Sequence, residues 1–399
     1  MNVMAIEGNV SVVLYMDGNK VHAADVASNR PFLAHKLLRK QTPESAVKMI
    51  SSLYRICANA QAYASIQAME LALGIQASEP IQLARAQMLR METLREHVWR
   101  ILLDWPVALG EEPGQQWMKG MLQIANRWQK AIDVKSQAYL IDSDAIEIDS
   151  KMAALLFSEC GDLLASTIFS MPPLEWLRLE DTDDLLVWAR KGETSAAKLL
   201  NALMDRGWAK TGQSDVQSLP DMDLSLLELL LTEQNAIHFM QMPELDGEPY
   251  ETSPCSRQAG HPLMKSLRRK YGNGLLTRLT AVLVEVAKMY QAMSEDFNDE
   301  AKQGDTPEIS GKLQAHTGIG VVEAARGRLI HCVRIQNGIV DDYQIVAPTE
   351  WNFHPKGALA RGMAGLKTDD EKDLKDQAKL LIHAMDPCVS FSLQVKDHA

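Results

Sequence analysis

Apolar residues recur at helical spacing through the middle of the chain. The segment LLTRLTAVLVEVAKMYQAM, residues 275–293, carries apolar side chains three or four positions apart, which predicts a long helix with one apolar face. Such a stripe is typical of a helix packed into a core, and the 20 methionines fit the same interpretation because flexible thioethers fill gaps between helices. Its members are Leu275, Leu276, Leu279, Val282, Leu283, Val286, Met289, Tyr290 and Met293.

The segment TPESAVKMISSLYRICANA, residues 42–60, predicts where this helical region begins. Thr42 suits a helix cap, Pro43 suits a first turn, and Glu44 places negative charge near the positive end of the helix dipole. Cys57 then falls on a helix beside alanines, where a lone cysteine is usually a small buried hydrophobic residue.

Two regions alternate apolar and polar residues and predict β-structure. NVSVVLYMDGNKVHAADV, residues 9–26, has two β-rich runs around an Asp-Gly turn, which is a hairpin signal. Late in the chain, GRLIHCVRI and YQIVAPTEWNFHP flank a turn at Asn337-Gly338, and Pro348 is expected to end the second strand.

The turn-rich segments at 205–222, 242–262 and 299–312 lack the composition of long linkers, so one domain is expected. A charged helix near residues 369–384 leads to a terminal Asp-Pro-Cys. We therefore predict an α+β fold, predominantly α, in a single domain. Its parts are an N-terminal hairpin (1–30), a helical core (42–300), a C-terminal hairpin (313–355), and a helix with the terminal segment (356–399).

Composition and charge narrow the class of protein. The 399 residues carry 41 basic and 52 acidic side chains, a net charge of −11, which argues against binding nucleic acid or an anionic membrane. We find no stretch approaching about 20 apolar residues and no signal peptide, so we expect no membrane insertion and a cytoplasmic location. The five cysteines form no CxxC pair, which argues against a disulfide framework or a zinc knuckle.

Four segments together resemble a known family. YRICANAQAYASIQAMELALG, VVEAARGRLIH, IVDDYQIVAPTEWNFHP and the terminal DPC are similar, in the same order, to landmarks of the large subunit of nickel–iron hydrogenases. The resemblance implies that family's helical core and its metal site. In the family, two CxxC pairs hold a nickel–iron centre whose iron carries cyanide and carbon monoxide.

The departures from this family pattern are equally informative. Cys57 and Cys388 stand at the first position of each pair, but Ala60 and Phe391 replace the second cysteines. By the resemblance, the lost cysteines would bridge the two metals and the kept ones would bind nickel alone. Leu33 stands where the family has a proton-relay glutamate. We therefore expect no nickel and no hydrogen turnover, so the protein is not predicted to be an enzyme.

The resemblance also implies a partly preserved pocket on the iron side. Arg326 matches the arginine that the family aims at a diatomic ligand, and a guanidinium suits a cyanide nitrogen in a dry cavity. Pro348 and Thr349 match the segment that donates from the other side, although the same residues are equally typical of a strand end.

This combination is similar to the HupK/HoxV-type hydrogenase maturation proteins. The resemblance implies a scaffold that transiently holds an Fe(CN)2(CO) unit. It would receive the unit from the Hyp machinery with a HypC-like chaperone and pass it to the hydrogenase large subunit. Our hypothesis is that Cys57 and Cys388 bind the iron, because thiolates favour low-spin iron and two thiolates permit release where four would trap it.

Other interpretations stay open at this point. The fold also resembles the quinone-site subunit of respiratory complex I, an electron-transfer component, and a metal-free assembly chaperone is a further alternative. Cys388 could belong to a terminal strand anchored in the core. His22 and His331 are expected to be packing histidines, and no metal is assigned at Glu7. Cys160, Cys255 and Cys332 lack motif neighbours and are expected to be structural.

Overall fold

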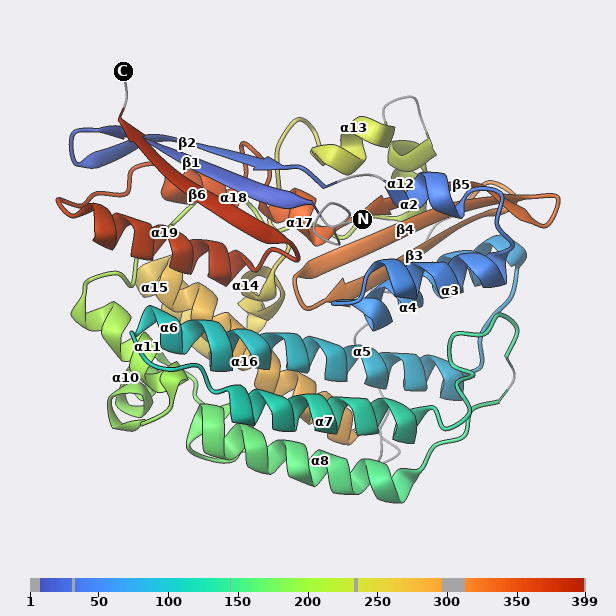
Figure 1. Ribbon diagram of the computed structural model, residues 1–399, viewed down its shortest axis with the longest axis horizontal. Helices are drawn as coiled ribbons and strands as arrows, with labels where there is room; N and C mark the ends of the chain where they lie inside the picture. Colours follow the sequence, from blue (N-terminus) through green and yellow to red (C-terminus); the bar gives the residue numbers. More distant parts are fainter. Residues whose placement is uncertain (1–7, 31–32, 144, 233–235, 296–312, 398–399) are drawn as a thin grey trace.

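The computed structural model describes residues 8–30, 33–143, 145–232, 236–295 and 313–397. Helices predominate and two small sheets flank them, which confirms the predicted α+β class (Figure 1). The turn-rich segment at 299–312 lies outside the described residues, and so does Glu7.

A layer of long helices forms the base of the molecule. α5 (Glu79–Trp99), α7 (Gln115–Ile132) and α8 (Ser150–Leu164) run beside one another, with α16 (Leu275–Glu295) packed against α5 (Figure 1). The stripe predicted on α16 is buried in the main hydrophobic core. The shorter helices beside this layer are α6 (Trp105–Ala108), α9 (Pro173–Trp176), α10 (Thr182–Lys191), α11 (Ser195–Asp205), α14 (Pro254–Arg257) and α15 (Pro262–Tyr271). Three others, α12 (Leu224–Thr232), α13 (Ala236–Gln241) and α18 (Ala358–Met363), lie against the sheets.

α8 qualifies as a candidate membrane span by length and apolarity, together with the π-helical turn that follows it, through Phe169. This corrects the expectation that no stretch approaches that length. Its inner face packs into the main core, where Cys160 and Leu164 are fully buried and Phe157 stacks on Tyr290 with ring centroids 4.2 Å apart. The apolar residues on the inner face of α8 therefore pack the core of the folded protein.

The first sheet joins segments from both ends of the chain in the order β2-β1-β6. β1 (Asn9–Asp17) and β2 (Lys20–Ser28) form the predicted hairpin around Gly18, whose φ of +58° suits glycine in a tight turn. β6 (Ser390–Asp397) then pairs with β1 in parallel (Figure 1). The terminal strand considered from the sequence is therefore present, and it directly follows Cys388.

The second sheet has the order β3-β4-β5. β4 (Gly327–Gln336) and β5 (Ile339–Val346) form the predicted hairpin, and both Asn337 and Gly338 take the positive φ values that its two-residue turn requires. β3 (Thr317–Ala324) adds a third strand that the sequence analysis did not separate. β5 ends at Val346, two residues before Pro348, where the sequence predicted the strand to stop. Pro348 opens the short helix α17 (Pro348–Asn352), because proline fits the first helical turn.

The single helix predicted over residues 42–60 is two helices. α3 (Pro43–Leu53) has the predicted cap, in which Thr42 Oγ1 accepts a hydrogen bond from the Ser45 backbone N–H at 3.3 Å. The chain then turns, and α4 (Ala58–Leu73) begins immediately after Cys57. Cys57 therefore lies at the cap of α4, with φ −114° and ψ 44°, and not inside a helix as its alanine neighbours suggested.

α4 rests almost directly on the backbone of β3. A Cβ atom at Gly318 would overlap the carbonyl oxygen of Ala68, and one at Gly320 would overlap that of Ala64. Glycines on the strand and alanines on the helix thus allow an approach that larger side chains would prevent. This contact sets the distance between β3 and α4, the helix that begins directly after Cys57.

Candidate functional site

Cys57 and Cys388 come together from opposite ends of the chain. Cys57 caps α4, and Cys388 lies two residues beyond Asp386, the left-handed residue (φ 48°) that ends α19 (Glu371–Met385). Both cysteines are free and partly buried. Burial, followed by the charges of Cys388 and Glu92, raises the pKa of Cys57 to about 12, so the two sulfurs are within electrostatic reach of each other.

A hydroxyl group contacts the sulfur of Cys388, and a side-chain amide contacts the sulfur of Cys57. Thr349 Oγ1 lies 3.1 Å from Cys388 Sγ, and Gln61 Nε2 donates to Cys57 Sγ at 3.9 Å. Pro348 is buried at the start of α17, directly before Thr349. The structure therefore brings Thr349 to the thiols, while the binding of metal by these cysteines stays a prediction.

Arg326 lies in the tight β3–β4 turn and is 5% exposed. Its Nη2 donates to Glu96 Oε2 at 3.1 Å, and its Nε lies 3.4 Å from Asp386 Oδ2. Asn352 Nδ2 donates to the backbone carbonyl of Arg326 at 2.9 Å. Burial alone lowers the pKa of Arg326, but Asp386, Glu96 and the two thiols more than offset this and raise it. Arg326 is thus a permanent cation facing the thiol pair.

Asp386 connects the arginine to the end of α19. Arg100, from the π-helical turn Arg100–Asp104, donates through Nε to Asp386 Oδ1 at 2.6 Å and through Nη2 to the Pro387 carbonyl at 3.3 Å. Burial raises the pKa of Asp386, but Arg100 and Arg326 outweigh it, so that the net pKa is lowered. An ionised Asp386 held by two guanidinium groups orients the backbone immediately before Cys388.

A second guanidinium, that of Arg30, also faces the thiols. Arg30 follows β2, and its Cζ lies 5.0 Å from the centroid of the Tyr54 ring. Burial lowers the pKa of Arg30, but Cys388, Tyr54 and Glu350 raise it by a larger amount. Its Nη1 is buried and has no hydrogen-bond partner among the described residues. The sequence analysis considered the motif that contains Arg30 only for its final leucine.

Glu92, on α5, caps the first turn of α4 next to Cys57. Its carboxylate oxygens accept hydrogen bonds from the backbone N–H groups of Asn59 and Ala60, at 2.8 and 2.9 Å. Burial raises the pKa of Glu92 to about 7, against partial lowering by Arg95. By the family resemblance, Ala60 stands where a cysteine is expected. Its methyl group is buried, and its backbone N–H donates to the Glu92 carboxylate.

The donor set fits an iron group that carries anionic diatomic ligands. Two thiols supply soft ligands, while Arg30, Arg326 and Thr349 supply hydrogen-bond donors, and Arg30 Nη1 is buried without a hydrogen-bond partner in the described chain. Phe391, at the other lost cysteine position, packs its ring 5.4 Å from the His383 ring. Across residues 8–397, leaving aside the gaps stated above, no group of three or more His, Cys, Asp and Glu side chains is arranged to hold a metal ion.

Comparisons with known proteins agree with this arrangement. Over 92% of its length the chain is 29% identical to the hydrogenase expression/formation protein HoxV of Cupriavidus necator, and the match covers 92% of that protein. It is 26% identical to the hydrogenase expression/formation protein HupK of Azotobacter vinelandii, over 97% of this chain and 98% of HupK. The chain is a homologue of the HoxV and HupK proteins.

The same relationship extends to hydrogenase large subunits. Residues 230–393 match the family model described as nickel-dependent hydrogenase, a span that contains Arg326, Thr349 and Cys388. The fold is similar to that of the Ni-Fe-Se hydrogenase from D. vulgaris Hildenborough in the reduced state, with a TM-score of 0.63, 16% sequence identity and 94% of each chain covered. The predicted large-subunit-like core is therefore confirmed.

The remaining histidines and cysteines give a mixed outcome for the sequence analysis. His331 is a fully buried packing histidine, as predicted, with Nδ1 2.7 Å from the Tyr343 hydroxyl and Nε2 3.0 Å from Gln61 Oε1. His22 is exposed on β2 and not packed as predicted, because it points away from the buried face of the sheet. The three cysteines expected to be structural are all buried, and they are Cys160, Cys255 and Cys332.

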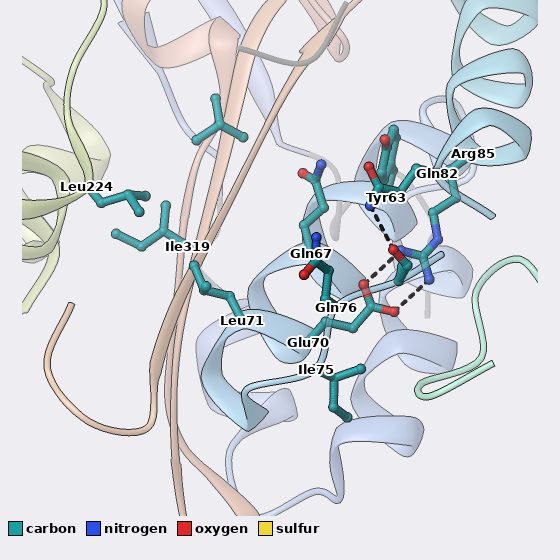
Figure 2. A pocket seen from close by; sticks show the side chains of 12 residues that line it. Tyr63, Gln67, Glu70, Leu71, Ile75, Gln76, Gln82, Arg85, Leu224 and Ile319 are labelled. Atoms are coloured by element: carbon teal, nitrogen blue, oxygen red, sulfur yellow. Dashed lines mark hydrogen bonds and ion pairs between the residues drawn. The ribbon is translucent and has the colours of Figure 1, made fainter. Parts of the chain in front are cut away.

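A cavity of about 410 Å³ lies at the other end of α4 from Cys57 (Figure 2). A bidentate ion pair lies at its wall, in which Arg85 donates to both oxygens of Glu70 at 2.7 and 2.8 Å. Arg85 Nε also donates to the Ala138 carbonyl at 2.7 Å. These contacts hold α4 to α5 and support the helix that positions Cys57.

We expect Glu350→Gln to change how stability depends on pH. Glu350 is 4% exposed, its Oε1 accepts from Ser28 Oγ at 3.3 Å, and burial raises its pKa to about 7 from 4.5, against lowering by Arg30. Between pH 4.5 and 7 the unfolded wild type has lost this proton while the folded state keeps it, so wild-type stability falls as the pH rises. Glutamine cannot ionise, and the variant should gain up to about 3 kcal/mol relative to wild type across this window.

Urea unfolding of both proteins at several pH values between 4 and 8 measures this effect. Glu112→Gln, which removes an exposed carboxylate, controls for the change in net charge. Parallel pH profiles for wild type and Glu350→Gln would show that Glu350 is not held protonated by burial.

Proposed function

We propose that this protein is an accessory protein of nickel–iron hydrogenase maturation that transiently holds an Fe(CN)2(CO) unit between Cys57 and Cys388. The printed names of its relatives, hydrogenase expression/formation proteins, support the maturation role. The observation that carries the finer proposal is the convergence of two thiols beneath Arg326 while Ala60 and Phe391 replace the other two cysteines.

The chemistry of the side chains is consistent with a carrier. Thiolates are soft ligands suited to low-spin iron, and binding would release the thiol protons because the thiolate is the ligand. Arg326 and Thr349 would donate to cyanide nitrogens, since both are held at the thiol pair by buried contacts. Two thiolates hold the cargo less firmly than four, which favours transfer to another protein.

The same proposal covers the partners and the reaction. The unit would arrive from the Hyp machinery with a HypC-like chaperone and leave to the hydrogenase large subunit. No nickel is expected, because the thiols that would complete a nickel–iron centre are absent from the sequence at positions 60 and 391. The protein would act in the cytoplasm, without hydrogen turnover of its own.

Infrared spectroscopy with iron analysis tests this function directly. Protein purified from cells that also produce the maturation machinery is expected to show cyanide and carbonyl stretching bands and close to one iron per chain. The same protein from cells without that machinery is the control, and it should show neither band. A spectrum without these bands in both preparations would leave a metal-free assembly chaperone as the better account.

A further inference from the structure

We propose, on the basis of the function above, that Arg30 is a second anchoring residue for the iron unit and that its Nη1 donates to a cyanide nitrogen. Nothing in the family comparison assigns a role to this side chain. Its place in the site follows from its contacts, its buried donor and its lack of a dedicated carboxylate partner.

Arg30 is held in place by contacts with two other segments of the chain. The preceding residue, Asn29, donates from its backbone N–H to the Asn9 carbonyl at 2.8 Å, which ties the end of β2 to β1. Gly8 packs so closely that a Cβ atom there would lie 2.7 Å from Arg30 Cα. The guanidinium lies over the Tyr54 ring, just before Cys57. An arginine fixed in this way is not a freely moving surface cation.

The charges around Arg30 differ from those around Arg326. Arg326 has two carboxylates, Glu96 and Asp386, within 3.4 Å of its nitrogens. For Arg30, the groups that raise its pKa most are Cys388, Tyr54 and Glu350, in decreasing order. Glu350 is itself engaged by Ser28 Oγ. Arg30 therefore lacks the pair of close carboxylates that holds Arg326.

Arg30 Nη1 shows what kind of ligand is missing. It is a buried donor without an acceptor in the described part of the chain, and buried guanidinium N–H groups are normally satisfied. An iron-bound cyanide presents a nitrogen lone pair with partial negative charge, which suits such a donor, whereas bound carbon monoxide is a poor acceptor. A unit attached to Cys57 and Cys388 would bring its cyanides to both guanidinium groups, because Arg30 lies on Tyr54, three residues before Cys57, and Arg326 pairs with Asp386, two residues before Cys388.

The test compares infrared spectra of iron-loaded wild type, Arg30→Met and Arg30→Lys, purified from cells that produce the maturation machinery. We expect both variants to shift one cyanide band relative to the other while the carbonyl band stays in place, and to carry several-fold less iron. Lysine keeps the charge but not the planar fork, so a shift in both variants identifies the directed hydrogen bond. Arg127→Met, which removes an exposed arginine on α7, is the matched control and should match wild type.

The outcomes separate this inference from the proposed function. Wild-type protein without cyanide or carbonyl bands would overturn the proposed function, and this inference with it. Bands that persist in wild type and are unchanged in both Arg30 variants would overturn the role of Arg30 alone. A shift of all bands together in Arg30→Met, with none in Arg30→Lys, would reduce Arg30 to a charge that stabilises thiolates. Circular dichroism and thermal unfolding show whether each variant is folded.

Discussion

Replacing Cys57 and Cys388 together by alanine is expected to abolish the iron-bound cyanide and carbonyl bands. The two thiols are the soft ligands that converge at the site, and Arg326 and Thr349 can orient a cyanide but cannot form a covalent bond to iron. Iron content should fall at least about tenfold, which corresponds to ~1.4 kcal/mol or more of binding free energy. Infrared spectra and iron analysis of protein made with the maturation machinery measure this loss.

The fold should tolerate this double replacement. Both cysteines are only partly buried, so their removal should reduce the free energy of unfolding by about 1 kcal/mol each. Cys160→Ala is the matched control: it removes a fully buried thiol in the core and should leave the bands unchanged. Bands of wild-type intensity in the double variant would show that other groups hold the iron.

Replacing Gly320 by alanine is expected to destabilise the protein by about 3 kcal/mol and to disturb the site at a distance. The added Cβ would overlap the carbonyl oxygen of Ala64, so β3 and α4 must separate. Backbone atoms on both sides leave no flexible side chain to yield. Since Cys57 caps α4, the separation also moves one thiol relative to the other.

Chemical denaturation and iron analysis together check this expectation. Gly260→Ala is the control, because a Cβ atom there meets nothing within 4 Å and its φ is not positive. That variant should keep wild-type stability to within about 0.5 kcal/mol. A Gly320→Ala protein as stable and as rich in iron as wild type would mean that α4 can shift without cost.

The sequence predicted the local elements well. Both hairpins follow from alternation within 20 residues and a two-residue turn, and the cap at Thr42 follows from four adjacent letters. The break before Cys57 was missed because no glycine or proline marks it. The pairing of β6 with β1 was not predicted either, since it joins residues near opposite ends of the chain.

The site could be predicted only as far as the family motifs reach. They pointed to Cys57, Cys388, Arg326 and Thr349, and the structure places these four together. The positions of Arg30, Glu92 and Glu350 at the site arise from three-dimensional packing, which no local sequence pattern predicts. For the contact of Gly318 and Gly320 with α4, the one available signal was the GIG sequence of β3 opposite an alanine-rich helix.

The parallel pairing of β6 with β1 has a consequence for how the protein is made. Residues 390–397 are synthesised long after residues 9–17, and the ribosome must release them before the sheet β2-β1-β6 can close. Cys388 lies two residues before that last strand, so a growing chain carries Cys57 without its counterpart until residue 388 is added. A site that needs both thiols can therefore form only after Cys388 has been added, and a chain stalled or clipped ahead of residue 388 would keep only one of the two soft ligands.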